Sequence, residues 1–194
     1  MQDLKFLEGA AKEFLIAIGE DLDREGLLDT PKRMAKMWKE MFYGYDPKQK
    51  PKVTVFPNGK DGIVYDEMIT DEGYFYSFCE HHSVTFFGNF FFGYIPGANV
   101  IGISKISRIV DYYAARLQVQ ERLVLDVVND LDNILKPKGC GLVMKGRHLC
   151  KEMRGVKKRD TSTTTTALRG CFQNDIATRT EFLGRVQSEN LRRY

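Results

Sequence analysis

The three histidines of this 194-residue chain lie in two short segments, residues 79–82 and 148–150, and each segment also contains a cysteine. Histidine and cysteine bind zinc, and histidine also moves protons near neutral pH. Cys79 and His82 have an ordinary ligand spacing, but Cys150 is far along the chain, so the fold must bring the two segments together. Three protein ligands leave a tetrahedral metal one open position, which is typical of catalytic zinc. The pattern therefore indicates an enzyme.

A long strand is predicted over residues 84–95, because apolar side chains alternate on both of its faces. One face carries Val84, Phe86, Phe90, Phe92 and Tyr94, and the other carries Phe87, Phe91 and Ile95. A strand that is apolar on both faces is covered on both sides. We therefore expect a sheet with layers above and below it.

Helices are predicted before and after this strand. The first runs from Leu4 to near Gly19, and the second begins at Thr30-Pro31, with a hydroxyl N-cap followed by proline. Later apolar stripes at 106–117 and 124–135 are out of phase across residues 118–120, which predicts two helices separated by a break.

Shorter strands and a linker complete the predicted organisation. Strands are expected at residues 53–56 and 63–65, paired as a hairpin, and at 100–103, 141–145 and 167–172. A proline-containing linker at residues 43–52 separates a helical region, 1–46, from an α+β domain, 47–194.

Composition excludes several classes of protein. The net charge of +3 is too small to indicate a nucleic-acid partner, and no apolar run approaches the roughly 18 residues of a membrane span. The first five residues are unlike a signal peptide. The four cysteines are too sparse for a disulfide framework, so we expect reduced thiols in a cytoplasmic protein.

Four motifs in a single order resemble GTP cyclohydrolase I, over about residues 30–183. They are Cys79-Glu80-His81-His82, residues 101–110, residues 116–123, and His148-x-Cys150 followed by Arg154-Gly155. The resemblance implies a tunnelling fold, in which an antiparallel sheet backed by two helices, with N-terminal helices, closes into a barrel by oligomerisation. It also implies a homo-oligomer, a toroidal decamer.

The reaction implied by the resemblance converts GTP and water to 7,8-dihydroneopterin triphosphate and formate, through hydrolysis at C8, ring opening and recyclisation. This is the first step of pterin and folate-type biosynthesis. The pathway that takes the product, whether folate, biopterin or a deazaguanine nucleoside, stays open.

The resemblance also assigns the metal and the acid–base groups. It gives Zn²⁺ the ligands Cys79, His82 and Cys150, with water in the fourth position, and makes His81 and His148 the catalytic histidines. If residues 148–150 are extended, His148 and Cys150 share one face of the strand and look into one pocket.

Substrate contacts follow from the same motifs. The resemblance implies that Lys105, Arg108 and Arg154 bind the triphosphate, and Ser104, at an expected helix N-cap, is placed to bind an anion with them. Glu121 accepts the guanine N1–H and 2-amino protons, and Gln120 is a weaker candidate for the same edge of the purine. Because sites of this family lie between subunits, we expect Glu121 and Arg154 to reach a neighbour's metal.

One residue departs from the family pattern. Glu152 is acidic where the family more often has a neutral or basic residue, close to the triphosphate end. It would weaken phosphate affinity unless Lys157 and Lys158 compensate for its charge.

Other classes of protein predict different patterns. A structural zinc module would need a fourth ligand from Cys140 or Cys171, which read instead as packed thiols. A zinc nucleobase deaminase would need a Cys-x-x-Cys motif, which the sequence lacks. The metal-independent nitrile reductase of the same fold would lack the His/Cys set, and a catalytically silent member stays possible.

Overall fold

The computed structural model describes residues 3–191 of a chain that divides into two compact units, Met1–Gln49 and Lys50–Tyr194. In the first unit, helix α1 (Leu4–Ala17) packs against helix α2 (Thr30–Met41), with Ala11, Leu15 and Ala35 buried. Three short 3₁₀ turns accompany them: η1 (Glu25–Leu27), η2 (Tyr43–Tyr45) and η3 (Pro47–Gln49). Asp29 precedes α2 as its cap, so Thr30 is its first residue rather than its N-cap.

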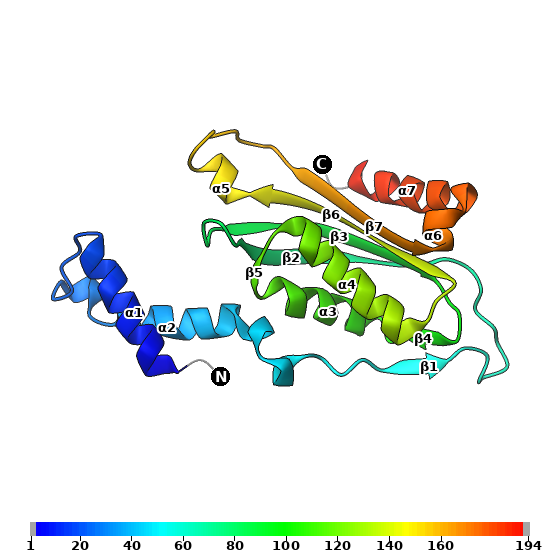
Figure 1. The fold of residues 1–194 in the computed structure, drawn as a ribbon, viewed down its shortest axis with the longest axis horizontal. Helices are drawn as coiled ribbons and strands as arrows, with labels where there is room; N and C mark the ends of the chain where they lie inside the picture. Colours follow the sequence, from blue (N-terminus) through cyan, green and yellow to red (C-terminus); the bar gives the residue numbers. More distant parts are fainter. Residues whose placement is uncertain (1–2, 192–194) are drawn as a thin grey trace. The chain divides into compact units, whose positions relative to one another are not determined.

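The second unit is built on a five-stranded sheet in the order β5-β2-β3-β6-β7 (Figure 1). Its strands are β2 (Ile69–Cys79), β3 (Thr85–Ile95), β5 (Leu117–Gln118), β6 (Gly139–His148) and β7 (Thr163–Gly170). All neighbours are antiparallel except β5, which runs parallel to the end of β2. The β3–β6 register sets Phe86 opposite His148, so the end of β6 lies beside the turn between β2 and β3.

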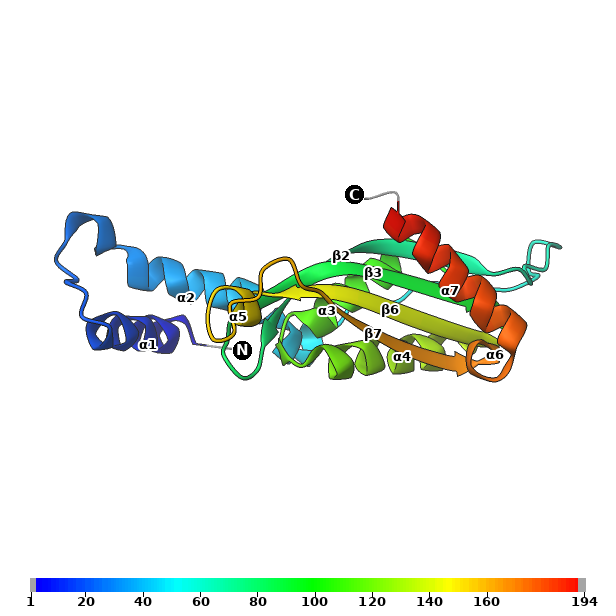
Figure 2. The same cartoon turned by 90° about the horizontal axis from the view of Figure 1, so that it is seen from above.

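Helices cover both faces of the sheet (Figure 2). Helices α3 (Ser104–Ala114) and α4 (Gln120–Leu135) pack on one face, against Phe86, Phe90, Phe92 and Tyr94 of β3. On the other face, Phe182 of α7 (Ile176–Leu191) lies 5.7 Å from the ring of Phe91, next to the short α6 (Cys171–Asn174). The predicted strand and its two covered faces are therefore confirmed.

The predicted hairpin at residues 53–65 is wrong. Strand β1 (Val55–Pro57) pairs with β4 (Asn99–Ile101), so β4 does not fold back onto β3. Residues 63–65 are not a strand, because the side chain of Asn58 takes the place of a ladder: its Nδ2 donates to Tyr65 O at 2.8 Å, and its Oδ1 accepts from Tyr65 N at 2.9 Å. A side-chain amide thus closes the loop.

The break between α3 and α4 is confirmed, and β5 occupies it. Strand β7 begins four residues earlier than expected, at Thr163, and ends two residues earlier, because Gly170 has a positive φ of 58° and the chain turns there into α6. Strand β2 and helix α7 were not predicted. Within residues 3–191, the helices are all too short or too polar to cross a membrane.

Candidate metal centre and active site

The turn between β2 and β3 gathers two histidines around a thiol. Cys79 ends β2, its carbonyl accepts from Ser83 N at 2.8 Å, and Ser83 adopts a left-handed φ of 54°. This tight turn brings Nδ1 of His81 to 3.6 Å and Nδ1 of His82 to 3.7 Å from the Cys79 sulfur. The turn by itself therefore places two of the candidate metal ligands, Cys79 and His82, close together.

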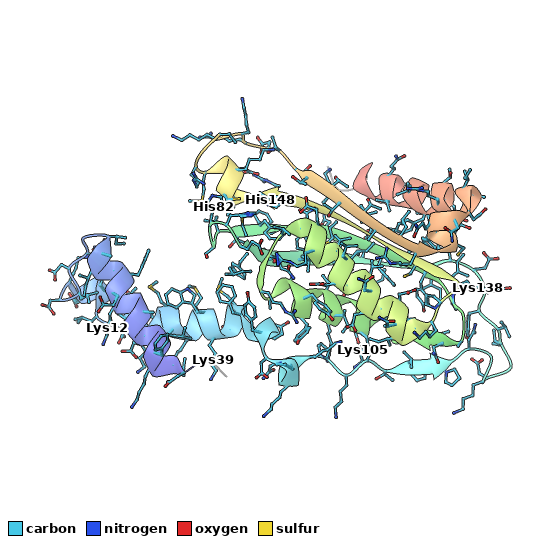
Figure 3. The ribbon with its side chains drawn as sticks, viewed as in Figure 1. Lys12, Lys39, His82, Lys105, Lys138 and His148 are labelled. Carbon is cyan, nitrogen blue, oxygen red and sulfur yellow. The ribbon has the colours of Figure 1, made fainter. Side chains whose placement is uncertain are left out.

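Cys150 completes the group from a different element. Strand β6 ends at His148 and the chain makes one helical turn, α5 (Leu149–Glu152), so the expectation of an extended 148–150 segment is wrong. The turn nevertheless carries the Cys150 sulfur to the other two: the ligand atoms of Cys79, His82 and Cys150 all lie within 4.8 Å of one another. Figure 3 labels His82 and His148, which both lie at this end of the sheet.

The group fits a tetrahedral metal. Zinc bonds of 2.0–2.3 Å set neighbouring S and N ligand atoms about 3.6 Å apart, close to the 3.7 Å between Cys79 Sγ and His82 Nδ1. Burial, followed by the neighbouring Cys79 thiol, raises the pKa of Cys150, so a cation is needed for two adjacent thiolates to exist at neutral pH.

Within residues 3–191, a fourth cysteine, histidine or carboxylate does not join the group of three. Cys140 is fully buried opposite Tyr94, at the other end of β6, and its thiol lies 3.8 Å from Asp132 Oδ1. Cys171 starts α6, also at that end. Among the described residues, then, the metal group has three ligands and one open position, as in catalytic rather than structural sites.

The half-buried ring of His148 is held in a fixed plane beside this group. Its ring stacks on Phe86, with centroids 4.6 Å apart and planes 2° from parallel. Burial lowers the pKa of His148, opposed by the nearby carboxylate of Glu121 and reinforced by Lys151. The imidazole is therefore neutral near pH 7, which is the state in which it can accept a proton.

Gln120 sets the orientation of that imidazole. The side chain is 1% exposed, and its Nε2 faces Met144 O, Thr163 O and Thr165 Oγ1 at 2.9–3.0 Å. Because the amide nitrogen faces these three acceptors, it is Oε1 that faces His148 Nε2, 2.9 Å away. An amide oxygen can only accept, so His148 Nε2 carries the proton and Nδ1 is the nitrogen presented to a reactant. The side chain that the sequence offered to a purine is thus engaged within the chain.

Glu121 and Arg154 lie on the same side of the molecule as the metal group. Both are exposed. Glu121 acts electrostatically on His148 of its own chain, and Arg154 lowers the pKa of Cys150 in the same way. Within one chain both residues thus act on groups of its own metal site, and the expectation that they reach a neighbour's metal stays a prediction.

The remaining anion-binding candidates lie at the opposite end of α3. The C-terminal end of α3 lies near the metal group, where Ser77 Oγ of β2 donates to Ala114 O at 2.8 Å. Ser104, Lys105 and Arg108 are in its first half, and Ser104 is the first helical residue rather than the N-cap. Ten residues of helix span about 15 Å, so a single chain does not bring Ser104 and Lys105 to the metal group (Figure 3).

Known proteins resemble this chain over most of its length. The family model described as GTP cyclohydrolase I matches residues 7–187. A GTP cyclohydrolase 1 from Deinococcus radiodurans is 47% identical over 182 residues, covering 93% of this chain and 83% of the relative. One from Wolinella succinogenes is 42% identical over 188 residues, covering 96% and 100%. Among solved structures, the archaeosine synthase QueF-Like in the apo form is 17% identical, with a TM-score of 0.45 over 53% of this chain and 93% of that one.

Proposed function

Since this chain belongs to the GTP cyclohydrolase I family and is a GTP cyclohydrolase, we propose that it hydrolyses GTP at C8 with zinc held by Cys79, His82 and Cys150. The products are 7,8-dihydroneopterin triphosphate and formate, formed by ring opening and recyclisation in the first step of a pterin or folate-type pathway. The convergence of three ligand atoms within 4.8 Å, from segments far apart in sequence, carries the proposal.

Two histidines move the protons. Zinc, when bound, acts as a Lewis acid and makes hydroxide available near neutral pH. His148 is neutral and presents Nδ1, so it first takes a proton from the attacking water and then returns it to the purine nitrogen that leaves C8. His81, with Nδ1 3.6 Å from the Cys79 sulfur, is close enough to exchange protons with the same reacting centre.

Fixed charges select and hold the nucleotide. The Glu121 carboxylate, in the first turn of α4, accepts the N1–H and 2-amino protons of guanine, a pair of donors that adenine does not present. Arg154, from the loop that follows α5, binds the triphosphate of the same substrate.

A second copy of the chain supplies the other phosphate contacts. Ser104 and Lys105 lie about 15 Å along α3 from the end that is near the metal group of their own chain, so they serve a neighbour's site, together with Arg108 from the same half of the helix. Strand edges support the assembly: among the described strands, β5 borders only Phe78 and Cys79 of β2, and β7 has a strand on one side only. Association along these edges closes the tunnelling-fold barrel, and we propose a toroidal decamer.

Incubating zinc-loaded protein with GTP tests the proposed function. Formate and, after oxidation, a fluorescent pterin are expected in equal amounts. Release of phosphate without formate would contradict it.

The free thiols of the metal group also require a reducing compartment, which supports a cytoplasmic location.

A further inference from the structure

Two charged side chains bracket the ligand Cys150. Arg147 is the penultimate residue of β6 and Glu152 is the last residue of α5. Arg147 Nε donates to Glu152 Oε1 at 3.0 Å, and Arg147 Nη2 donates to Oε2 at 2.7 Å. Paired bonds of this kind fix both distance and orientation. We propose that Arg147 and Glu152 form a clasp, a pair of positioning residues that holds Cys150 in place for the metal.

Cys150 needs such a support because its helix cannot supply one. Helix α5 has four residues and is closed by Met153 N donating to Leu149 O at 2.9 Å. One turn of helix is unstable by itself, since nucleation fixes several dihedral angles for a single hydrogen bond. The position of the thiol therefore depends on ties between α5 and the sheet, and the clasp joins the last residue of α5 directly to β6.

Arg147 is a firm anchor for this tie. It lies opposite Phe87 in the β3–β6 register, and its guanidinium carbon is 5.9 Å from the centre of the Phe87 ring. That ring in turn stacks on Tyr76 of β2, with centroids 5.8 Å apart. The guanidinium thus lies over the Phe87 ring, which Tyr76 supports from β2, and it approaches Asp160 of the following loop at 3.7 Å.

The clasp also accounts for the acidic residue that departs from the family pattern. The Glu152 side chain is only 8% exposed, whereas that of Arg147 is 46% exposed. Its carboxylate is turned into the Arg147 guanidinium, and its charge is balanced there rather than by Lys157 or Lys158. Glu152 therefore does not oppose a triphosphate, and its charge instead serves the metal ligand two residues away.

Zinc affinity tests the clasp. The proteins to compare are wild type, Arg147→Ala, Glu152→Ala and the double variant, each titrated with Zn²⁺ against a chromophoric chelator. Loss of a residue that supports a metal ligand typically weakens binding about 10- to 100-fold, and we expect each single change to do so. Because both remove the same clasp, the double variant should bind zinc about as weakly as either single one. Multiplying effects, or affinities within about twofold of wild type, would overturn the proposal.

The clasp proposal rests on the metal site of the proposed function. A matched control and a measurement on metal-free protein allow the clasp to be tested separately from that function. Arg24→Ala breaks an exposed pair with Glu20, at 2.9 Å, in the other unit and should leave zinc affinity unchanged. In metal-free protein, losing the clasp should speed hydrogen exchange at the amides of Met153 and Lys158, with Glu152→Gln intermediate because it keeps one acceptor. Unchanged exchange in all variants contradicts the clasp. A wild type that binds no zinc contradicts the metal site alone, while the exchange rates still decide the clasp.

Discussion

The imidazole of His148 lies parallel to the phenyl ring of Phe86, with centroids 4.6 Å apart and an angle of 2° between the planes. Phe86 is fully buried in the core between the sheet and helices α3 and α4. The plane of the histidine is therefore set by core packing, whereas Gln120 Oε1 sets which of its nitrogens faces outward. Core packing therefore sets the plane of the same ring that we propose transfers the proton.

Phe86→Leu should lower turnover about tenfold or more with zinc content unchanged, because the histidine loses the surface that fixes its plane. Phe90→Leu is the control: Phe90 is on the same strand and equally buried, but lies opposite Met144. Both changes should destabilise the fold by about 1–3 kcal/mol, measured by denaturant unfolding. Equal losses of turnover in the two variants would show that stability, not ring orientation, matters.

His148→Gln should fold and bind zinc normally while turnover falls roughly 10²-fold or more, the usual scale of lost acid–base catalysis. Cys150→Ser, two residues away, should lose metal and activity together. Metal analysis beside steady-state kinetics distinguishes them. If His148→Gln lost zinc but kept its activity per bound metal, the two roles would be reversed.

Glu121→Gln should damage guanine recognition, because an acceptor of two protons becomes a group with one donor that opposes one of them. Sites built on such pairing discriminate by up to about 10⁴-fold. A large fall in kcat/KM for GTP is expected with zinc content unchanged, and Glu13→Gln, exposed on α1, should match wild type. Unaltered kinetics would make Glu121 an ordinary surface residue.

Mixing two inactive chains should restore activity only when one substitution lies in the metal group and the other lies at the start of α3. Cys150→Ser and Lys105→Ala chains, unfolded and refolded together, should recover activity at about a quarter of their sites, the random expectation for a site shared by two chains. Cys150→Ser mixed with Glu121→Ala should stay inactive if Glu121 serves the same chain whose His148 it acts on electrostatically. Recovery in the second mixture alone would reverse the assignment.

Cys140 should make the fold sensitive to alkali. Burial, reinforced by Asp132, raises the pKa of this thiol from 9.0 to about 12. Since the unfolded chain releases this proton first, stability is intact below pH 9 and falls as the pH rises toward 12, by about 1.4 kcal/mol at pH 10. Cys140→Ala should lose this part of the pH dependence, measured as the difference in unfolding free energy between pH 8 and pH 10. Parallel curves for the two proteins would contradict the shift.

Sequence patterns predicted those parts of the fold whose cause is local. The alternation of residues 84–95 and the phase change between α3 and α4 are periodicities, and both were confirmed. Strand β2 was missed because its first half, Thr70-Asp71-Glu72-Gly73, is polar and carries no strand pattern. The hairpin at 53–65 failed because β1 takes its partner from residues 99–101, far along the chain.

At the site, the residue types pointed to Cys79, His82 and Cys150, which the fold brings together. Their companions could not be found in the same way. The bonds from Gln120 to Met144 and Thr163 and from Arg147 to Glu152 follow no helix or strand period. The Gln120 bonds depend on how α4 packs on β6 and β7, which long-range contacts set, and the Arg147–Glu152 pair depends on the turn that follows β6.

Gly146 is the residue that makes room for Gln120. A Cβ at position 146 would lie 2.5 Å from Gln120 Oε1, too close for that side chain to stay. Substitutions at this pair therefore have an order. A larger residue at position 146 becomes tolerable only after residue 120 has been shortened, and that shortening removes the oxygen that orients His148. Position 146 is thereby constrained by a residue 26 positions away, because a side chain larger than that of glycine is blocked there for as long as Gln120 is kept.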